Sequence, residues 1–308
     1  MILCCGEALV DMIERDTIDG HKGYVPFAGG AVFNTAIALG RLGAPASFFT
    51  GLSTDLFGDI LRKTLGESHV DVAPCAMSSR PTTMAFVKLI NGNANYTFYD
   101  EGTAGRMLTT GDLPNLDDAV STMHFGAISL IFEPCGATYE ALMTREHKTR
   151  LISLDPNIRA GFITDADAHR ARIKRMIAMA DIVKVSDEDL DWIAESADPS
   201  ETIAAWLKSG AKVVTVTRGA DGVDAFTSRG KTYAQSQRVT VVDTIGAGDT
   251  FNAGFLDGLR LKGALTKAGV ANLSEADLVF ALNRGAAAAA VTVSRAGANP
   301  PWLSEMPT

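Results

Sequence analysis

The chain has 308 residues, of which 46% are hydrophobic and 21% charged, and its formal net charge is −8 at pH 7. This composition is typical of a soluble globular protein with one large or two small domains. The acidic balance argues against nucleic acid or an anionic membrane as a partner, because both require a basic face.

The N-terminal stretch MILCCGEALVDMIERD has no basic leader and reaches Glu7 and Asp11 early. It therefore predicts a buried first strand and not a signal peptide. No apolar run approaches the ~18 residues of a membrane span. The cysteines show no C-x-x-C spacing, which indicates reduced thiols: Cys4, Cys5, Cys75 and Cys135. We expect a cytoplasmic protein without a membrane partner.

Short runs of β-branched and aromatic residues alternate along the chain with stretches of helical period. The predicted strands are 47–51, 121–130, 149–157, 181–186 and 211–219. The predicted helices are 31–42, 55–66, 137–147, 166–180, 199–209, 249–261 and 275–291. Such alternation predicts βαβ units around a mostly parallel sheet, with ligands at the carboxyl ends of its strands.

Two stretches break this alternation. Residues 12–28 and 83–100 have the pattern of antiparallel ribbons with Gly and Asn turns. They cannot bury both faces within the main sheet, so we expect a small lid sheet built from about 12–28 and 83–104. No linker or low-complexity tract divides the chain, which predicts one domain over residues 1–308.

The stretch VVDTIGAGDTFNAGF, residues 241–255, predicts a strand-to-helix corner with the helix beginning near residue 248. The first amide N–H groups of a helix are unpaired and carry partial positive charge, so they form an anion site. Gly246 and Gly248 remove Cβ atoms that would keep a phosphate away. Asp249 on the first turn is placed to accept a proton from a hydroxyl that attacks this phosphate.

Other interpretations of this corner remain. A glycine turn with an Asp at a helix start explains the same residues without any ligand. The stretch is not a G-x-G-x-x-G dinucleotide motif, because Phe251 occupies the third glycine position, and no Walker-type loop is present in the chain.

A second glycine loop, FAGGAVFNTAIALGRLG at 27–43, also enters an amphipathic helix. With GEALVD before it and DTIGAGD after it, the chain resembles the ribokinase or PfkB family of carbohydrate kinases over nearly its whole length. The resemblance implies a three-layer α/β/α fold with a mostly parallel central sheet and a β-sheet lid. It also implies transfer of the γ-phosphoryl group of ATP, with Mg²⁺, to a sugar hydroxyl.

The resemblance assigns roles to individual residues. The anion hole corresponds to Gly246, Ala247 and Gly248, with Asp249 as the base. The sugar-binding counterparts are Asp11, Gly29, Gly30 and Asn34, and the carboxylate of Asp11 and the amide of Asn34 suit hydroxyl groups. On the nucleotide side they are Asn283 and, in the segment TRGADG, Thr217, Gly219 and Gly222. A hairpin connection is the alternative for TRGADG.

The sequence departs from the family where Asn-x-x-Glu often organises Mg²⁺-bound water. Here VSDEDL offers Ser186 and Asp189, so direct ligation of Mg²⁺ by the protein is not expected. A monovalent-cation site for K⁺, known in some relatives, would correspond to Asp243, Ile245, Arg295 and Gly297. Pro301 replaces the serine that some relatives have, and a turn or cap acid is the alternative for Asp243.

The substrate prediction depends on two segments. YTFYDEGTAG at 96–105 and DPNIR at 155–159 look like fructokinase segments, although 2-keto-3-deoxygluconate kinases share a related DPN-x-R. Tyr96 and Phe98 are candidates to cover a sugar face, with Arg159 contacting a phosphate or an acid. Lid-core aromatics and a surface Arg are the alternatives.

Charge favours the neutral sugar. Asp11, Asp100 and Glu101 would repel a substrate carboxylate. We expect D-fructose as substrate, with 2-keto-3-deoxygluconate as the alternative, and a non-catalytic sugar- or nucleotide-binding protein as the alternative of another class. The exposed second face of the lid predicts a homodimer through the lids.

Overall fold

The computed structural model describes residues 1–90, 93–195 and 198–307, with side chains at 88–90 and 93–96 not described. Within these ranges a nine-stranded sheet has the order β15-β14-β13-β12-β11-β10-β1-β4-β6. Neighbours from β6 to β13 are parallel, and β14 and β15 extend the sheet as an antiparallel hairpin. The strands are β1 (Ile2–Cys5), β4 (Ala46–Phe49), β6 (Val70–Asp71), β10 (Thr122–Gly126), β11 (Leu151–Asp155), β12 (Ile182–Ser186), β13 (Val213–Thr217), β14 (Val223–Thr227) and β15 (Gly230–Ala234).

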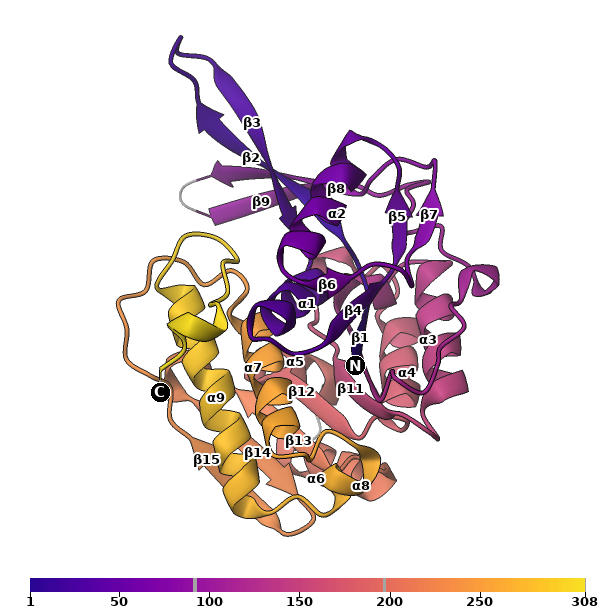
Figure 1. The fold of residues 1–308 in the computed structure, drawn as a ribbon, viewed down its shortest axis with the longest axis vertical. Helices are drawn as coiled ribbons and strands as arrows, with labels where there is room; N and C mark the ends of the chain where they lie inside the picture. Colours follow the sequence, from indigo (N-terminus) through magenta and orange to yellow (C-terminus); the bar gives the residue numbers. More distant parts are fainter. Residues whose placement is uncertain (91–92, 196–197, 308) are drawn as a thin grey trace.

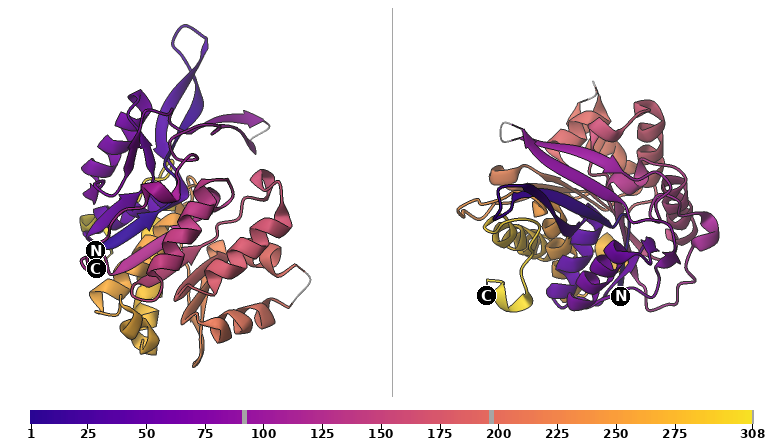
Figure 2. Two further views of the ribbon diagram at one scale, coloured as in Figure 1. Left: turned by 90° about the vertical axis from the view of Figure 1, so that its right-hand side faces the viewer. Right: turned by 90° about the horizontal axis from the view of Figure 1, so that it is seen from above.

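Helices cover both faces of this sheet (Figures 1 and 2). Successive strand residues point to opposite faces, so Cys4 of β1 lies in the core beneath α1, α7 and α9, and Cys5 lies in the core beneath α3, α4 and α6. The predicted three-layer α/β/α fold is thereby confirmed. The helices are α1 (Ala31–Arg41), α2 (Leu56–Glu67), α3 (Cys135–Glu146), α4 (Ala166–Ile177), α5 (Asp187–Ala194), α6 (Pro199–Ser209), α7 (Ala247–Leu261), α8 (Lys267–Ala271) and α9 (Glu275–Val293).

A separate four-stranded sheet projects from one end of the molecule (Figure 1). Its order is β3-β2-β8-β9, with β2 (Leu9–Asp16), β3 (Lys22–Gly29), β8 (Met84–Ile90) and β9 (Asn93–Tyr99). The two hairpins are antiparallel, as their alternating pattern predicted, and they join through parallel pairing of β2 with β8. This lid sheet carries Asp11 on β2 and Phe98 on β9.

The longest helix, α9, is apolar enough and long enough by composition alone to cross a membrane. It packs along α7 and beside β15, and the residues of α9 that are buried there are mainly Leu, Ala and Gly. Core helices of soluble proteins have the same composition, and 44% of the apolar window of α9 is buried within the fold.

Several short elements were not predicted. They include α5 and α8, the hairpin strands β14 and β15, the strand pair β5 (Gly51–Ser53) and β7 (Ala76–Ser78), and the 3-10 turns η1 (Thr110–Asp112), η2 (Ala127–Leu130), η3 (Ala160–Phe162), η4 (Gly219–Asp221) and η5 (Leu303–Glu305). Elements of three to eight residues show too few periods to be recognised. α7 begins at Ala247, one residue before the predicted start. The strand predicted before it is absent, because residues 235–244 have no regular secondary structure.

Candidate active site

A cavity of about 660 Å³ lies where the carboxyl ends of β11, β12 and β13 meet the N-termini of α1 and α7 and the inner face of the lid. This is the edge of the sheet at which ligands of open α/β folds bind. The residues singled out in the sequence that line it are Asp11, Gly30, Asn34, Phe98, Arg159, Ser186, Asp189, Thr217, Gly219, Ile245, Gly246, Ala247, Gly248 and Asp249.

The other predicted residues lie outside this lining. Gly29 sits behind the Asp11 carboxylate and leaves room for it. Gly222, at φ 88°, turns β13 into β14, and Asn283 is exposed on α9. The backbone of Tyr96 pairs with Val87 in the lid, but its side chain lies outside the described part of the chain.

The N-terminus of α7 opens into the cavity without a side-chain cap. Gly246 precedes the helix with φ 77°, in the left-handed region that favours glycine, and a Cβ there would lie 2.8 Å from the Cβ of Ala298. A Cβ at Gly248 would lie 3.1 Å from Nζ of Lys184. Uncapped amides at a helix start form a site for an anion, and here a lysine ammonium lies beside them.

Asp249, on the first turn of α7, is 7% exposed and lines the cavity. Burial raises the pKa of its carboxyl to about 6, the Asp155 charge adds to this, and Asn34, Lys184 and Arg159 act in the opposite direction. The Asn34 amide donates a hydrogen bond of 2.9 Å to Oδ2 of Asp249. This carboxylate is therefore fixed in orientation and more basic than an exposed aspartate.

Lys184 was not among the residues predicted from sequence. It is 5% exposed, ends in the cavity, and its Nζ donates to Oδ2 of Asp155 at 2.9 Å. Asn252 on α7 donates to the same oxygen at 2.7 Å. Burial opposes the charge of Lys184, but Asp155, Asp189 and Asp249 outweigh it and hold its pKa above the ordinary value. A permanent positive charge thus faces the α7 N-terminus.

Glu7 was also not predicted as a site residue. Its Oε1 accepts hydrogen bonds from the N–H groups of Ala31 at 2.7 Å and Val32 at 3.4 Å, at the start of α1. Burial, with a further contribution from Asp249, raises the pKa of Glu7 to about 7 although these backbone donors oppose it. The α1 N-terminus is therefore occupied by the protein's own carboxyl group, whereas that of α7 is open to a ligand.

The lid side of the cavity carries groups suited to hydroxyls. Burial raises the pKa of Asp11 to about 6. Gly30, at φ 115°, directly precedes α1, which presents Asn34 to the cavity. The ring of Phe98 contacts that of Phe162 edge-on at 4.6 Å between centroids. Arg159 is exposed at the cavity wall, close enough to Asp249 to lower the pKa of that carboxyl.

On the other side of the cavity, Ser186 and Asp189 form a capping box at the start of α5. The Ser186 hydroxyl accepts from the Asp189 N–H at 3.0 Å, and Oδ2 of Asp189 accepts from the Ser186 N–H at 3.1 Å. Oδ1 of Asp189 accepts from the Ile158 N–H at 2.9 Å. Both carboxylate oxygens thus have backbone donors.

The acidic residues beside this capping box are suited to the water ligands of a divalent metal ion. Asp187, Glu188 and Asp189 line the cavity there. Mg²⁺ in proteins keeps several waters and takes few carboxylate ligands. No group of three or more His, Cys, Asp or Glu side chains arranged for a metal occurs within the described ranges.

The residues of the predicted monovalent-cation site lie together on two adjoining loops. Oδ1 of Asp243 accepts from the Ile245 N–H at 3.0 Å, and Oδ2 accepts from the Gly297 N–H at 2.9 Å. Arg295 pairs with Glu305 at 2.7 Å and does not line the cavity. Asp243 therefore has the contacts of a turn acid, and it also ties the loop before α7 to the loop after α9.

Known proteins resemble this chain throughout its length. The model of the pfkB family carbohydrate kinases matches residues 1–305. A fructokinase from Rhizobium leguminosarum bv. trifolii is 61% identical over 275 residues, which is 89% of this chain and 84% of the relative.

Solved structures agree in fold. Fructokinase from Xylella fastidiosa, solved with bound ATP, superposes with a TM-score of 0.89 at 28% identity, covering 99% of this chain and 94% of that one. Fructokinase from Vibrio cholerae O395, solved with fructose, ADP and calcium, gives 0.82 at 26% identity over 96% and 94%. A double mutant of the latter was solved with fructose, ADP and potassium. The chain belongs to the pfkB family of carbohydrate kinases.

Proposed function

We propose that this carbohydrate kinase transfers the γ-phosphoryl group of ATP to the primary hydroxyl of D-fructose, giving fructose 6-phosphate. The observation that carries the proposal is the position of Asp249, a buried carboxylate on the first turn of a helix whose uncapped N-terminus opens into the cavity. The similarity to fructokinases supports the choice of sugar. A non-catalytic binder would have no need for an oriented carboxylate at this point.

In the proposed mechanism each group has one task. Asp11 and Asn34 hold sugar hydroxyls, since a carboxylate accepts hydrogen bonds and an amide donates and accepts. Asp249 accepts the proton of the attacking hydroxyl. The amides at Gly246, Ala247 and Gly248 stabilise the charge on the transferred group, as preorganised donors do. The Lys184 ammonium adds its charge at the same place.

The nucleotide is proposed to lie along Thr217 and Gly219, with Gly222 and Asn283 at the outer edge of its site. Mg²⁺ supplies charge neutralisation of the β- and γ-phosphates when bound. Asp187, Glu188 and Asp189 are the residues placed to hold its water ligands, and Ser186 keeps Asp189 oriented through the capping box.

The substrate preference follows from the charge distribution in the cavity. The lid side has Glu7 and Asp11, whereas Lys184 lies at the phosphate side. We expect kcat/KM for D-fructose to exceed that for 2-keto-3-deoxygluconate at least ~10-fold, about 1.4 kcal/mol of transition-state binding. ADP release with each sugar, with ribose and adenosine as controls, measures the ratio. A preference for the keto-deoxy acid would replace fructose as substrate and leave the kinase mechanism intact.

The raised pKa of Asp249 predicts the pH dependence. A base must be ionised to accept a proton, so kcat/KM is expected to fall as the pH drops below about 6. If the base had the pKa of an ordinary aspartate, the acidic limb of the pH–rate profile would lie near pH 4. The Asn34→Ala variant, which removes a hydrogen bond that lowers the pKa, should shift the limb to higher pH. A rate independent of pH between 5 and 7 would contradict the assignment.

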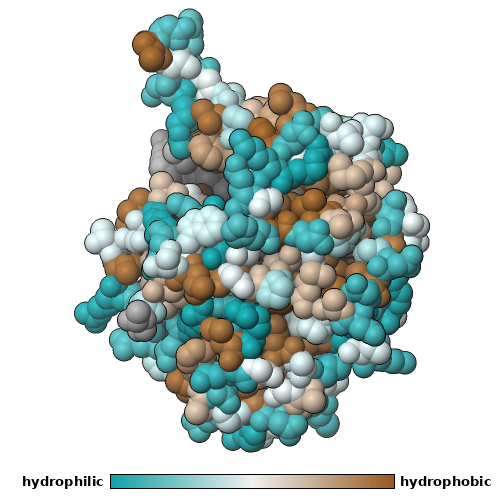
Figure 3. Space-filling view, viewed as in Figure 1, coloured by the Kyte–Doolittle hydropathy of each residue, from teal (hydrophilic) through white to brown (hydrophobic). Residues whose placement is uncertain are grey.

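We further propose that residues 1–308 form one kinase domain, with a lid of about 12–28 and 83–104 through which two copies associate. On the lid face away from the cavity, the ring of Phe86 contacts those of Tyr24 and Tyr99, which are 43% and 57% exposed. Figure 3 also shows apolar atoms at the tip of the protruding hairpin. Burying such rings favours association.

The dimer predicts about twice the monomer mass by light scattering at micromolar concentration. Replacing Tyr24 and Tyr99 with Ser should return the mass to that of the monomer. A strictly monomeric wild-type protein would refute association through the lid.

A potassium site beside Asp243 and a cytoplasmic location complete the proposal. The Asp243 carboxylate joins the loops around Ile245 and Gly297 by accepting a hydrogen bond from the N–H group of each. Dependence of kcat on potassium distinguishes a cation site from a structural turn. The buried free thiols of Cys4, Cys5 and Cys135 suit a reducing compartment.

A further inference from the structure

A second, small cavity adjoins the lid side of the active site. Its volume is about 30 Å³, and it shares Glu7, Phe98 and Ile128 with the main cavity. Asp100 and Arg106 lie in its wall. A space of this size holds about one water molecule or one small substituent of a ligand. Groups in its wall therefore lie within reach of the non-reacting end of a sugar bound beneath the lid.

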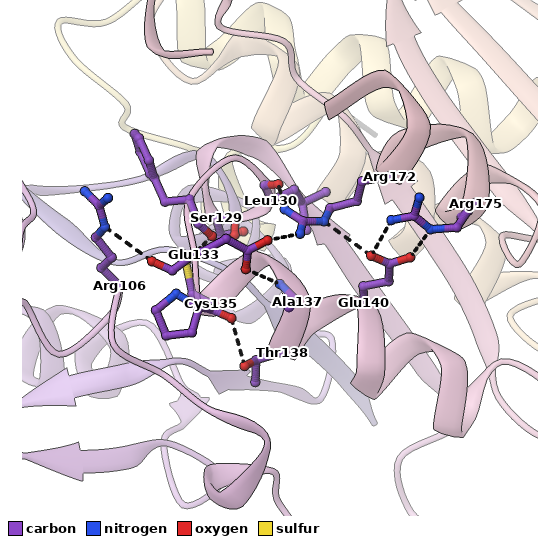
Figure 4. Close-up of polar contacts among 12 residues, drawn as sticks. Arg106, Ser129, Leu130, Glu133, Cys135, Ala137, Thr138, Glu140, Arg172 and Arg175 are labelled. Atoms are coloured by element: carbon purple, nitrogen blue, oxygen red, sulfur yellow. Dashed lines mark hydrogen bonds and ion pairs between the residues drawn. The ribbon is translucent and has the colours of Figure 1, made fainter. Parts of the chain in front are cut away.

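Asp100 and Arg106 form a shielded ion pair. Nη1 of Arg106 lies 2.9 Å from Oδ2 of Asp100, and the two side chains are 28% and 13% exposed. The guanidinium also packs over the ring of Phe132 at 4.9 Å from its centroid. Its Nε donates to the carbonyl oxygen of Glu133 at 3.4 Å (Figure 4). These contacts hold Arg106 at the wall of the small cavity.

The segment that supports Arg106 is itself braced. Glu133 pairs through its carboxylate with Arg172, whose Nη1 donates to the Leu130 carbonyl at 2.9 Å (Figure 4). Arg172 and Arg175 both contact the carboxylate of Glu140 on α3. The backbone around the small cavity is thus fixed independently of Asp100, so a change of the Asp100 side chain leaves Arg106 at the wall.

The cations among the described residues that line either cavity are Arg106, Arg159 and Lys184. Lys184 is paired with Asp155 beside the α7 N-terminus. Arg159 follows β11 and acts on the charge of Asp249. Arg106 is therefore the cation in the wall of the small cavity, and the Asp100 carboxylate cancels its charge.

We propose that Asp100 determines the preference for a neutral sugar by holding Arg106 in an ion pair. An acidic sugar then meets the carboxyl groups of Glu7 and Asp11, and the cation of the small cavity is already paired. Without the Asp100 charge, Arg106 becomes available to a substrate carboxylate, which a guanidinium binds well. This inference rests on the proposed fructose kinase activity.

The test compares Asp100→Asn with the wild type on D-fructose and 2-keto-3-deoxygluconate. The ratio of kcat/KM for the acid to that for fructose is expected to rise at least ~10-fold, mainly through a lower KM for the acid. Asn keeps the size of the side chain, and the hydrogen bonds from Thr103 go to the main-chain oxygen of residue 100, so they remain. Asp100→Ser provides a second variant should Asn fold poorly.

Two controls make the outcome specific. Asp16→Asn removes an acid that, like Asp100, is paired with a basic residue, here Lys22 at 2.6 Å. Asp16 lies at the far end of the lid hairpin, so this variant should leave the ratio unchanged. The double variant Asp100→Asn/Arg106→Gln should lose the gain for the acid. An unchanged ratio in folded Asp100→Asn, or a gain that persists in the double variant, would overturn the role of the pair. Absence of fructose turnover in the wild type would instead refute the proposed function.

Discussion

Replacing Asp249 with Asn is expected to lower kcat by at least ~10²-fold, the usual minimum for a positioned base. The side chain keeps its shape, and its remaining oxygen still accepts the hydrogen bond that Asn34 donates at 2.9 Å. Only the capacity to take a proton is lost. The measurement is steady-state ADP release with saturating D-fructose and Mg-ATP.

The same variant should bind nucleotide nearly as well as the wild type, because the amides of the α7 N-terminus are unchanged. Equilibrium binding of an ATP analogue checks this. Asp118→Asn in the loop before β10, an exposed acid that lies outside the cavity lining, is the charge-matched control and should turn over normally. Near-normal kcat in properly folded Asp249→Asn would refute the assignment of the base.

Replacing Lys184 with Met is expected to lower kcat by about 10²- to 10³-fold, the range seen when one stabilising donor of a developing charge is removed. Nζ of Lys184 lies beside Gly248 at the α7 N-terminus, where the transferred group is proposed to sit. Met has a similar length and no charge. Single-turnover phosphoryl transfer separates this effect from weaker ATP binding.

The Lys184→Met protein is also expected to be less stable, because the carboxylate of Asp155, 2% exposed, loses its positively charged partner. Leaving one charge of a buried pair uncompensated costs about 3–5 kcal/mol of unfolding free energy. The double variant Lys184→Met/Asp155→Asn removes both charges. It should recover most of the stability, measured by urea unfolding, without recovering kcat. Recovery of both would make Lys184 a structural residue only.

The sequence alone predicted the layers of the fold because the long elements carry clear periods. The helices 31–42, 55–66 and 199–209 were predicted within about one residue of their observed bounds. The lid ribbons were recognised from alternation and turn residues. Their parallel junction between β2 and β8 was not predicted, since strand order depends on contacts between segments about 70 residues apart.

The site was predicted where one local motif carries the chemistry and missed where distant segments combine. Gly246, Gly248 and Asp249 stand together at one helix start, and uncapped amides need no partner to be recognised. Lys184 appeared only as a charged residue within the apolar run DIVKVS, a pattern that a surface lysine shares. Its role becomes visible only in the folded chain. There Lys184 meets Asp155, 29 residues away in sequence, and Asp155 meets Asn252, 97 residues away.

Glu7 illustrates the same limit. The segment GEALVD supports the family resemblance but assigns no role to Glu7, whose function depends on α1 beginning 24 residues later at Ala31. The reason for Gly246 also changed with the structure. A phosphate close to the chain was the predicted reason for both glycines, whereas Gly246 is required by its left-handed conformation and by the contact with Ala298.

The most direct test of phosphoryl transfer to fructose is phosphorus NMR of the wild-type enzyme incubated with Mg-ATP and D-fructose. The proposed function predicts that the γ-phosphate signal of ATP disappears only when the sugar is present. A sugar phosphomonoester signal on the primary hydroxyl should grow in step with ADP. ATP loss that yields only inorganic phosphate, or no loss with fructose under conditions where ATP binds, would contradict a fructose kinase whose base is Asp249.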